Sequence, residues 1–285
     1  MLWVAFAFGS AFFAGITAIL AKIGIQDVDS TLATALRTVV ILLFSWLMVF
    51  VVGSQGKLRS ISSETIAFLV LSGLSTGASW LCYFKALQLG NVNKVTPIDK
   101  SSTVLAIVLS FLLLGESLSM ARVLGTAAIT VGTLLMITRQ KGTQKEQKGW
   151  LLYALLSAVF ASLTAIFGKL GIASVESDLG TALRTIVVLF MAWGMVFLQG
   201  RQREIQAIDG RSWLFLLLSG VATGLSWLCY YRALQDGPAS VVVPIDKLSI
   251  LVTIVFSSLV LKEHLSKKAF IGLVRILVGT GAMLL

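Results

Sequence analysis

Ten long apolar runs, separated by short polar segments, make up almost the whole chain. They cover Trp3–Ala21, Leu32–Val52, Ile66–Leu87, Pro97–Leu114, Ala121–Ile137, Trp150–Phe167, Leu179–Leu198, Trp213–Leu234, Pro244–Leu261 and Ala269–Leu285. A helix needs roughly 20 such residues to cross the hydrocarbon of a bilayer. The runs lack the strict apolar–polar alternation of barrel strands. The pattern therefore predicts an all-α polytopic membrane protein with ten transmembrane helices.

Composition agrees with this prediction. Charged residues are 13% of the chain, against about 25% in an average soluble domain, and the mean hydropathy is +0.93. The formal net charge of +10 is spread over the segments between the apolar runs. We therefore expect membrane lipid head groups as partners and no nucleic acid.

The chain contains a repeat at a constant offset. The sequence TALRT occurs at 34–38 and again at 181–185, and SWLCY occurs at 79–83 and again at 226–230. Residues that correspond at this offset, such as Thr34 and Thr181, are called repeat mates. The repeat predicts two homologous units, residues 1–138 and 150–285, joined by a polar linker at 139–149. The two units are fused in one chain, so we expect the protein to work as a monomer.

Each unit carries five apolar runs, which is an odd number. The second unit must then enter the membrane from the side opposite to the first, which gives an inverted-topology repeat. This arrangement is typical of secondary transporters, whose binding site lies near the midplane between the repeats. Glycines repeated at small-xxx-small spacing, Gly73/Gly77 and Gly220/Gly224, predict close helix packing.

The tetrapeptide PIDK also occurs in both units, at Pro97–Lys100 and at Pro244–Lys247. Proline is favoured at a helix start, so the pattern predicts that these prolines begin two helices, with Asp99 and Asp246 in the first turn. Two interpretations stay open for the acids: a structural helix start, or a switchable polar lock at each mouth of a carrier. Lys100 and Lys247 oppose the helix dipole and need another stabilising partner or the head groups.

Further repeated residues inside or near the apolar runs are candidates for substrate binding or gating. They comprise basic residues and aromatic pairs that share a helix face: Arg37, Trp80, Tyr83, Lys85, Arg184, Trp227, Tyr230 and Arg232. We expect Arg37 and Arg184 to pair with the loop acids Asp29 and Glu176. If the topology is inverted, one basic cluster with one Asp lies at each mouth.

Other chemistry is poorly supported by the sequence. Cys82 and Cys229 lie in apolar runs, where cysteine behaves as a small hydrophobe, and the single histidine, His264, lies in a loop. The sequence has no nucleophile with a base and no ligand cluster at metal-binding spacing. We therefore expect no metal, no cofactor and no enzymatic activity.

The motifs SWLCY, ALQ.G, PIDK and E.LS, in this order in each unit, resemble the EamA domain of the drug/metabolite transporter superfamily. The resemblance implies a carrier in the bacterial inner membrane that moves small metabolites by alternating access, often outward. Basic residues outnumber the acids in the membrane, which favours an amino-acid-like substrate or an organic anion. A membrane binding or scaffold protein without transport is the alternative. The resemblance implies cytoplasmic termini, whereas the basic loops favour the opposite orientation, so the orientation stays open.

Overall fold

A computed structural model describes residues 2–24, 28–89, 95, 98–99, 101–117, 119–136, 148–260 and 267–283. These residues are helical apart from short connections, and none of them forms a strand. The helices are α1 (Leu2–Gly24), α2 (Ser30–Val52), η1 (Ser54–Ser60), α3 (Ser63–Leu89), α5 (Ser102–Leu114), α6 (Met120–Met136), α7 (Trp150–Gly171), α8 (Ser177–Leu198), η2 (Arg201–Ala207), α9 (Gly210–Asp236), α10 (Ala239–Asp246), α11 (Ser249–Val260) and α12 (Lys267–Met283).

Among the described residues, six helices are long and apolar enough to cross a membrane: α1, α2, α3, α7, α8 and α9. Shorter apolar helices occur at Ser102–Leu114, Met120–Leu135 and Phe270–Met283. Large apolar side chains point outward, such as Leu43 (67% exposed), Phe190 (73%) and Leu198 (84%). Water would penalise so much exposed apolar surface, whereas lipid does not. The chain is an integral, multi-pass membrane protein.

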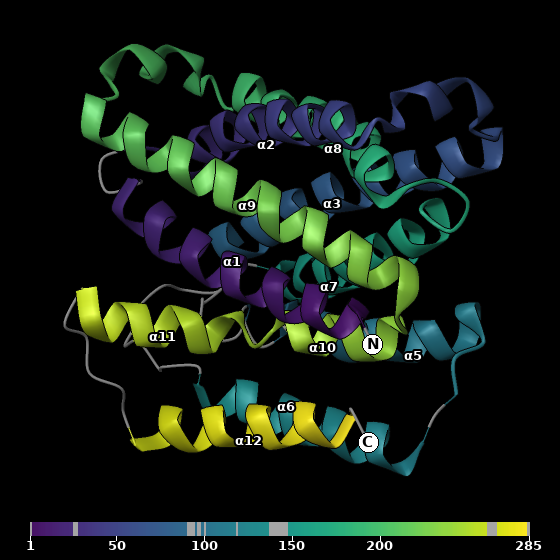
Figure 1. Cartoon of the computed structure of the whole chain (residues 1–285). Helices are drawn as coiled ribbons and strands as arrows, with labels where there is room; N and C mark the ends of the chain where they lie inside the picture. The colour runs from purple at the N-terminus through teal and green to yellow at the C-terminus, as the bar shows by residue number, and fades with distance from the viewer. Residues whose placement is uncertain are drawn as a thin grey trace.

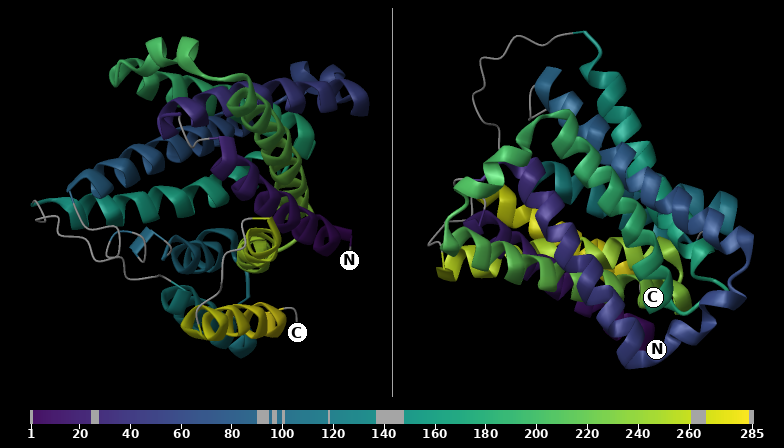
Figure 2. Two further views of the ribbon diagram at one scale, coloured as in Figure 1. Left: turned by 90° about the vertical axis from the view of Figure 1, so that its left-hand side faces the viewer. Right: turned by 90° about the horizontal axis from the view of Figure 1, so that it is seen from above.

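The helices lie in stacked layers, with α2 and α8 on one side and α6 and α12 on the other (Figure 1). The main packing partners join the two halves of the chain: α1 with α9, α3 with α7, α2 with α8, and α6 with α12. Both termini lie at one end of the bundle, here called the terminal end. The opposite end, here called the linker end, faces the viewer in the left view of Figure 2.

The repeated glycines lie where helices of the two halves cross. A Cβ on Gly73 would lie 2.6 Å from the Val187 side chain of α8, and one on Gly220 would lie 2.7 Å from the Val40 side chain of α2. Val40 and Val187 are themselves repeat mates. Any larger residue would force these helices apart, which confirms the predicted close packing.

Two long helices begin with matched side-chain caps. Ser62 accepts a hydrogen bond from the backbone N–H of Thr65 at the start of α3, and Asp209 accepts from Arg211 and Ser212 at the start of α9. Ser62 and Asp209 are repeat mates, so the same position caps the same helix in both halves. Hydrogen bonds from Ser212 keep the pKa of the Asp209 carboxyl below its ordinary value.

Candidate functional site

The second PIDK sequence lies at a break between two consecutive helices. Helix α10 ends at Asp246, and α11 begins at Ser249. Pro244 lies inside α10, so the prediction that it begins a helix is wrong, and Asp246 lies in the last turn, not the first. A proline inside a helix removes one backbone hydrogen bond, and here the helix ends two residues later. Eight residues place Asp246 about 12 Å along the α10 axis, well inside the bundle.

In the first copy, Ile98 and Asp99 are helical and α5 begins at Ser102. Pro97 and Lys100 lie outside the described residues. The predicted helix start at Pro97 and the predicted role of Lys100 are therefore untested.

Each aspartate accepts a hydrogen bond from a serine of the other half of the chain. Ser10 Oγ of α1 donates to Asp246 Oδ1 at 2.7 Å, and Ser157 Oγ of α7 donates to Asp99 Oδ1 at 2.8 Å. Each of these serines in turn accepts a hydrogen bond at its backbone carbonyl from another serine. Ser226 donates to Ser10, and Ser79 donates to Ser157, both at 3.1 Å. Every residue of one cluster is therefore the repeat mate of a residue in the other.

The two repeated arginines have different surroundings. Arg184 Nε donates to Ser72 Oγ at 2.9 Å, and its Nη2 donates to Thr76 Oγ1 at 2.6 Å. Arg37 Nη2 donates to Thr223, the counterpart of Thr76, at 2.7 Å. Neither arginine pairs with the loop acid that the sequence predicted. Asp29 instead caps α2 and lies 3.9 Å from Arg201, and Glu176 pairs with Lys57.

A polar cavity of about 340 Å³ lies between the two halves. Its lining includes six residues predicted from the sequence: Trp80, Arg184, Trp227, Tyr230, Asp246 and Lys247. Hydroxyls of Thr76, Ser79, Thr164 and Ser226 complete its polar surface. This volume suits a small ligand, and the mixture of aromatic rings with a few converging polar groups is typical of ligand-binding sites.

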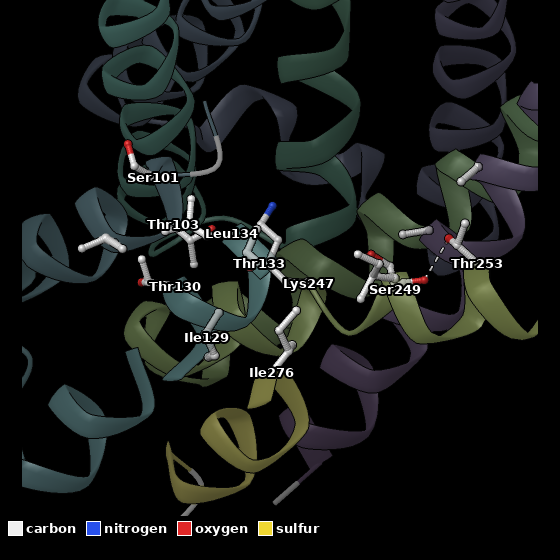
Figure 3. A pocket seen from close by; sticks show the side chains of 14 residues that line it. Ser101, Thr103, Ile129, Thr130, Thr133, Leu134, Lys247, Ser249, Thr253 and Ile276 are labelled. Atoms are coloured by element: carbon white, nitrogen blue, oxygen red, sulfur yellow. Dashed lines mark hydrogen bonds between the residues drawn. The ribbon is translucent and has the colours of Figure 1, made fainter. Parts of the chain in front are cut away.

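A second cavity, of about 370 Å³, adjoins the first and shares Ala14 and Lys247 with it. We call it the hydroxyl-lined cavity, because Ser101, Thr103, Thr130, Thr133, Ser249 and Thr253 line it. Figure 3 shows Lys247 between Thr133 of α6 and Ser249 of α11. Thr133 lies near the end of α6 that points to the linker end, so this cavity extends in that direction.

Comparison with known proteins identifies this architecture. A model of the EamA-like transporter family matches residues 1–138 and 148–285. The chain belongs to the EamA-like transporter family. A transporter described as uncharacterized in the cobO 3' region of Sinorhizobium sp is 46% identical over 138 residues, 48% of this chain and 96% of that relative.

Two further comparisons extend over most of this EamA-like transporter. The uncharacterized transporter YojE of Bacillus subtilis is 25% identical over 220 residues, which is 75% of this chain and 70% of YojE. A crystal structure superposes with a TM-score of 0.79 at 18% identity, covering 100% of this chain and 99% of the other. That likeness shows the fold alone. The family and the relatives' names identify a membrane transporter, and they point away from an enzyme.

The other predicted residues of the transporter lie outside the polar cavity. Tyr83, like Ile98 and Trp150, packs against the apolar cluster of Ala86, Val95 and Ala154. The Lys85 side chain is exposed. Arg232 pairs with Asp236 one turn away, and both side chains are 42% exposed. Arg232 therefore lies outside the cavity that Arg184, Asp246 and Lys247 line. One basic cluster with one Asp at each mouth stays a prediction.

Glu116, between α5 and α6, is a contact residue that was not predicted from the sequence as a site residue. Its carboxylate accepts from the backbone N–H groups of Ala239 at 2.6 Å and Ser240 at 2.9 Å, at the start of α10. Lys169 lies 3.2 Å away and also donates to the carbonyl of Gly237. Burial raises the pKa of the Glu116 carboxyl, but hydrogen bonds from Ser240 and Ala239 and the charge of Lys169 outweigh burial and lower it.

Sequence signals for these missed residues exist. Ser10/Ser157, Ser72/Ser219 and Glu116/Glu263 are each pairs of identical repeat mates. A search for every repeated polar residue, neutral ones included, would have found them.

Proposed function

We propose that the chain is a secondary transporter of ten membrane-spanning helices, arranged as two five-helix repeats of inverted topology. The repeats are residues 1–138 and 150–285, joined by 139–149. The observation that carries this proposal is the duplication of contacts between the halves. The Ser–Asp clusters, the glycine crossings and the helix caps all recur between repeat mates. A relative that aligns over 96% of its length with half of this chain also supports two units.

The polar cavity is the substrate site of this proposal. Trp80, Arg184, Trp227, Tyr230, Asp246 and Lys247 contact a small polar metabolite there, either amino-acid-like or an organic anion. Their repeat mates Arg37, Tyr83, Asp99 and Lys100 take up the corresponding places when the opposite end of the bundle opens. The helix break at Asp246 supports this assignment, because transporters build their sites from such discontinuous helices.

Transport occurs by alternating access in this proposal, and the contacts of Glu116 hold the terminal end closed. Glu116 belongs to the first half, whereas Lys169 and the start of α10 belong to the second, so its contacts tie the halves together at that end. The hydroxyl-lined cavity extends toward the linker end. Opening of the terminal end requires α10 to leave Glu116. Transport is outward across the bacterial inner membrane, as the family resemblance implies.

Efflux from liposomes tests the function. Purified protein is reconstituted into vesicles loaded with isotope-labelled amino acids and organic acids, and mass spectrometry follows their release. We expect release of a few anionic or zwitterionic compounds, and its loss in Lys247→Gln. Arg232→Gln is the matched control, because it also removes a repeated positive charge, but from a surface pair. Ligand binding without release would instead support the alternative, a membrane binding or scaffold protein.

Labelling tests the topology. Gly56 and Arg203 are exposed repeat mates on η1 and η2, at opposite ends of the bundle. Single cysteines at these positions, in a chain without Cys82 and Cys229, should react with an impermeant reagent from opposite sides of the membrane. Reaction from the same side would exclude the inverted repeat.

A further inference from the structure

The polar cavity contains an arginine, Arg184, that forms no ion pair with any acid the structure describes. Arg184 is 2% exposed. Two of its guanidinium nitrogens, Nε and Nη2, donate to the neutral hydroxyls of Ser72 and Thr76. Its third nitrogen, Nη1, is buried and has no hydrogen-bond partner among the described residues. No acid in the described part of the chain forms an ion pair with it.

Aromatic rings hold this guanidinium in place but do not neutralise it. Its central carbon lies 4.8 Å from the ring centre of Trp227 and 4.9 Å from that of Tyr231. Cation–π contacts of this kind compensate part of the cost of burying a cation. Full compensation requires an anion with hydrogen-bond acceptors. The arginine is therefore fixed in advance, with one donor group left for a ligand.

Lys247 provides a second positive charge in the same cavity. Its ammonium group forms no hydrogen bond and no ion pair with any residue that the structure describes. Asp246, which also lines the cavity, accepts from Ser10. Arg184, Lys247 and Asp246 together leave one positive charge unmatched among the described lining residues.

We infer that Arg184 and Lys247 form a subsite for the carboxylate group of the ligand. A guanidinium presents parallel N–H donors that match the two oxygens of a carboxylate, and the single unmatched charge fits a monoanion. Trp80, Trp227 and Tyr230 offer ring surface for the remainder of the molecule. Lys247 also lines the hydroxyl-lined cavity (Figure 3), so a carboxylate that enters through that cavity meets Lys247 before it reaches Arg184. The inference rests on the proposed function only in treating this ligand as the transported molecule.

The test compares two probes of the same shape and different charge, benzoate and benzamide. Ala14 lines both cavities, so Ala14→Cys in a chain without Cys82 and Cys229 reports on their occupancy. The rate of its reaction with a neutral maleimide is measured at increasing probe concentration. We expect benzoate to slow the reaction and benzamide to leave it unchanged at the same concentrations.

Removal of either positive charge should weaken protection by benzoate. Lys247→Gln and Arg184→Gln should each raise the half-protective benzoate concentration about ten- to a hundred-fold. Arg184→Lys should restore part of the protection, and Arg232→Gln should behave as the unsubstituted protein. Lys247→Gln keeps the test decisive if Arg184→Gln fails to fold, because the Lys247 ammonium group forms no hydrogen bond or ion pair with a described residue that the substitution would remove.

Three results would overturn the inference: equal protection by both probes, no protection by benzoate up to its solubility limit, or normal protection in the folded glutamine variants. Benzylammonium serves as a third probe, and preferential protection by it would assign the site to cations at Asp246. Protection by benzoate without efflux from liposomes would leave the carboxylate subsite standing and reject the proposed transport. Efflux without protection by benzoate would reject the carboxylate subsite and leave the proposed transport standing.

Discussion

The two halves of the chain share one set of polar contacts and differ in another. The Ser–Asp contacts are the same in both, at 2.7 Å for Ser10 and Asp246 and 2.8 Å for Ser157 and Asp99. The arginine contacts differ. Arg184 Nε is bonded to Ser72, whereas Arg37 Nε and Ser219 Oγ, the corresponding atoms, are both buried without a partner among the described residues.

Under the proposed alternating access, this difference distinguishes contacts that are kept in both states from contacts that change. In a carrier with inverted repeats, the two halves exchange conformations when access alternates. A contact present in both halves is then kept in both states. A contact present in one half and absent from its mate is made in one state and broken in the other. Under the proposed alternating access, the bond of Arg184 with Ser72 belongs to the state shown here, and we expect a bond of Arg37 with Ser219 in the opposite state.

The largest expected effect concerns Ser72 and Ser219. Ser72→Ala removes a charge-assisted bond from the state shown here, whereas Ser219→Ala removes one from the opposite state. Each substitution should shift the ratio of the two states about ten- to a hundred-fold, because such a bond contributes about 1.5–3 kcal/mol. The shifts should have opposite signs, as measured by distances between spin labels at the two ends of the bundle. Shifts of the same sign would show that the difference between Arg37 and Arg184 is unrelated to access.

A smaller and equal effect is expected for the Ser–Asp contacts. Ser10→Ala and Ser157→Ala each remove one hydroxyl donor from a half-buried carboxylate. Each should lower the free energy of unfolding by about 1–3 kcal/mol, and the two values should agree closely. Neither variant should change the ratio of states. Chemical denaturation in detergent measures the first quantity, and a several-fold difference between the two serines would contradict the equivalence of the clusters.

The smallest effect is expected from pH at the terminal end. The lowered pKa of Glu116 means that its carboxylate binds protons less readily in the folded protein than in the unfolded chain. Its contribution to stability is therefore complete above the ordinary pKa of glutamic acid, about 4.3, and is lost only as the pH falls through the lower folded value. Access from the terminal end should stay constant between about pH 6 and pH 8. A change within that range, retained in Glu116→Gln, would assign the pH response to another group.

Much of the fold was predictable because it depends on local patterns. Apolar runs predict membrane helices. Pairs of glycines four residues apart predict close helix crossings, and such crossings occur at Gly73 in the first half and at Gly220 in the second. The helix break at Asp246 was not predictable from Pro244, because proline is also favoured at helix starts. The start of α10 depends on Glu116, which is 123 residues away in the chain and binds the N–H of Ala239.

The candidate site was predictable only in part. Large aromatic and charged residues draw attention in an apolar chain, and six of those selected line the polar cavity. Their partners are neutral serines and threonines, which are common in membrane helices and give no signal of their own. Ser10 meets Asp246 across 236 residues, and this pairing follows from packing of α1 against the other half. Arg232, like Arg184, is a basic residue within an apolar run. Its position on α9, however, places it beside Asp236 at the surface.

Access to the polar cavity from both sides of the membrane tests the central claim, alternating access, most directly. Ala14→Cys, in a chain without Cys82 and Cys229, is treated with an impermeant maleimide from each side of oriented vesicles. Alternating access predicts reaction from both sides, and a Glu116→Gln substitution should raise the rate from the terminal end and lower it from the linker end. If the Glu116 contacts stabilise the closed terminal end by about 1 kcal/mol, their loss changes the ratio of the two access states about five-fold. A simultaneous rise of both rates, or reaction from one side alone in both proteins, would contradict the account.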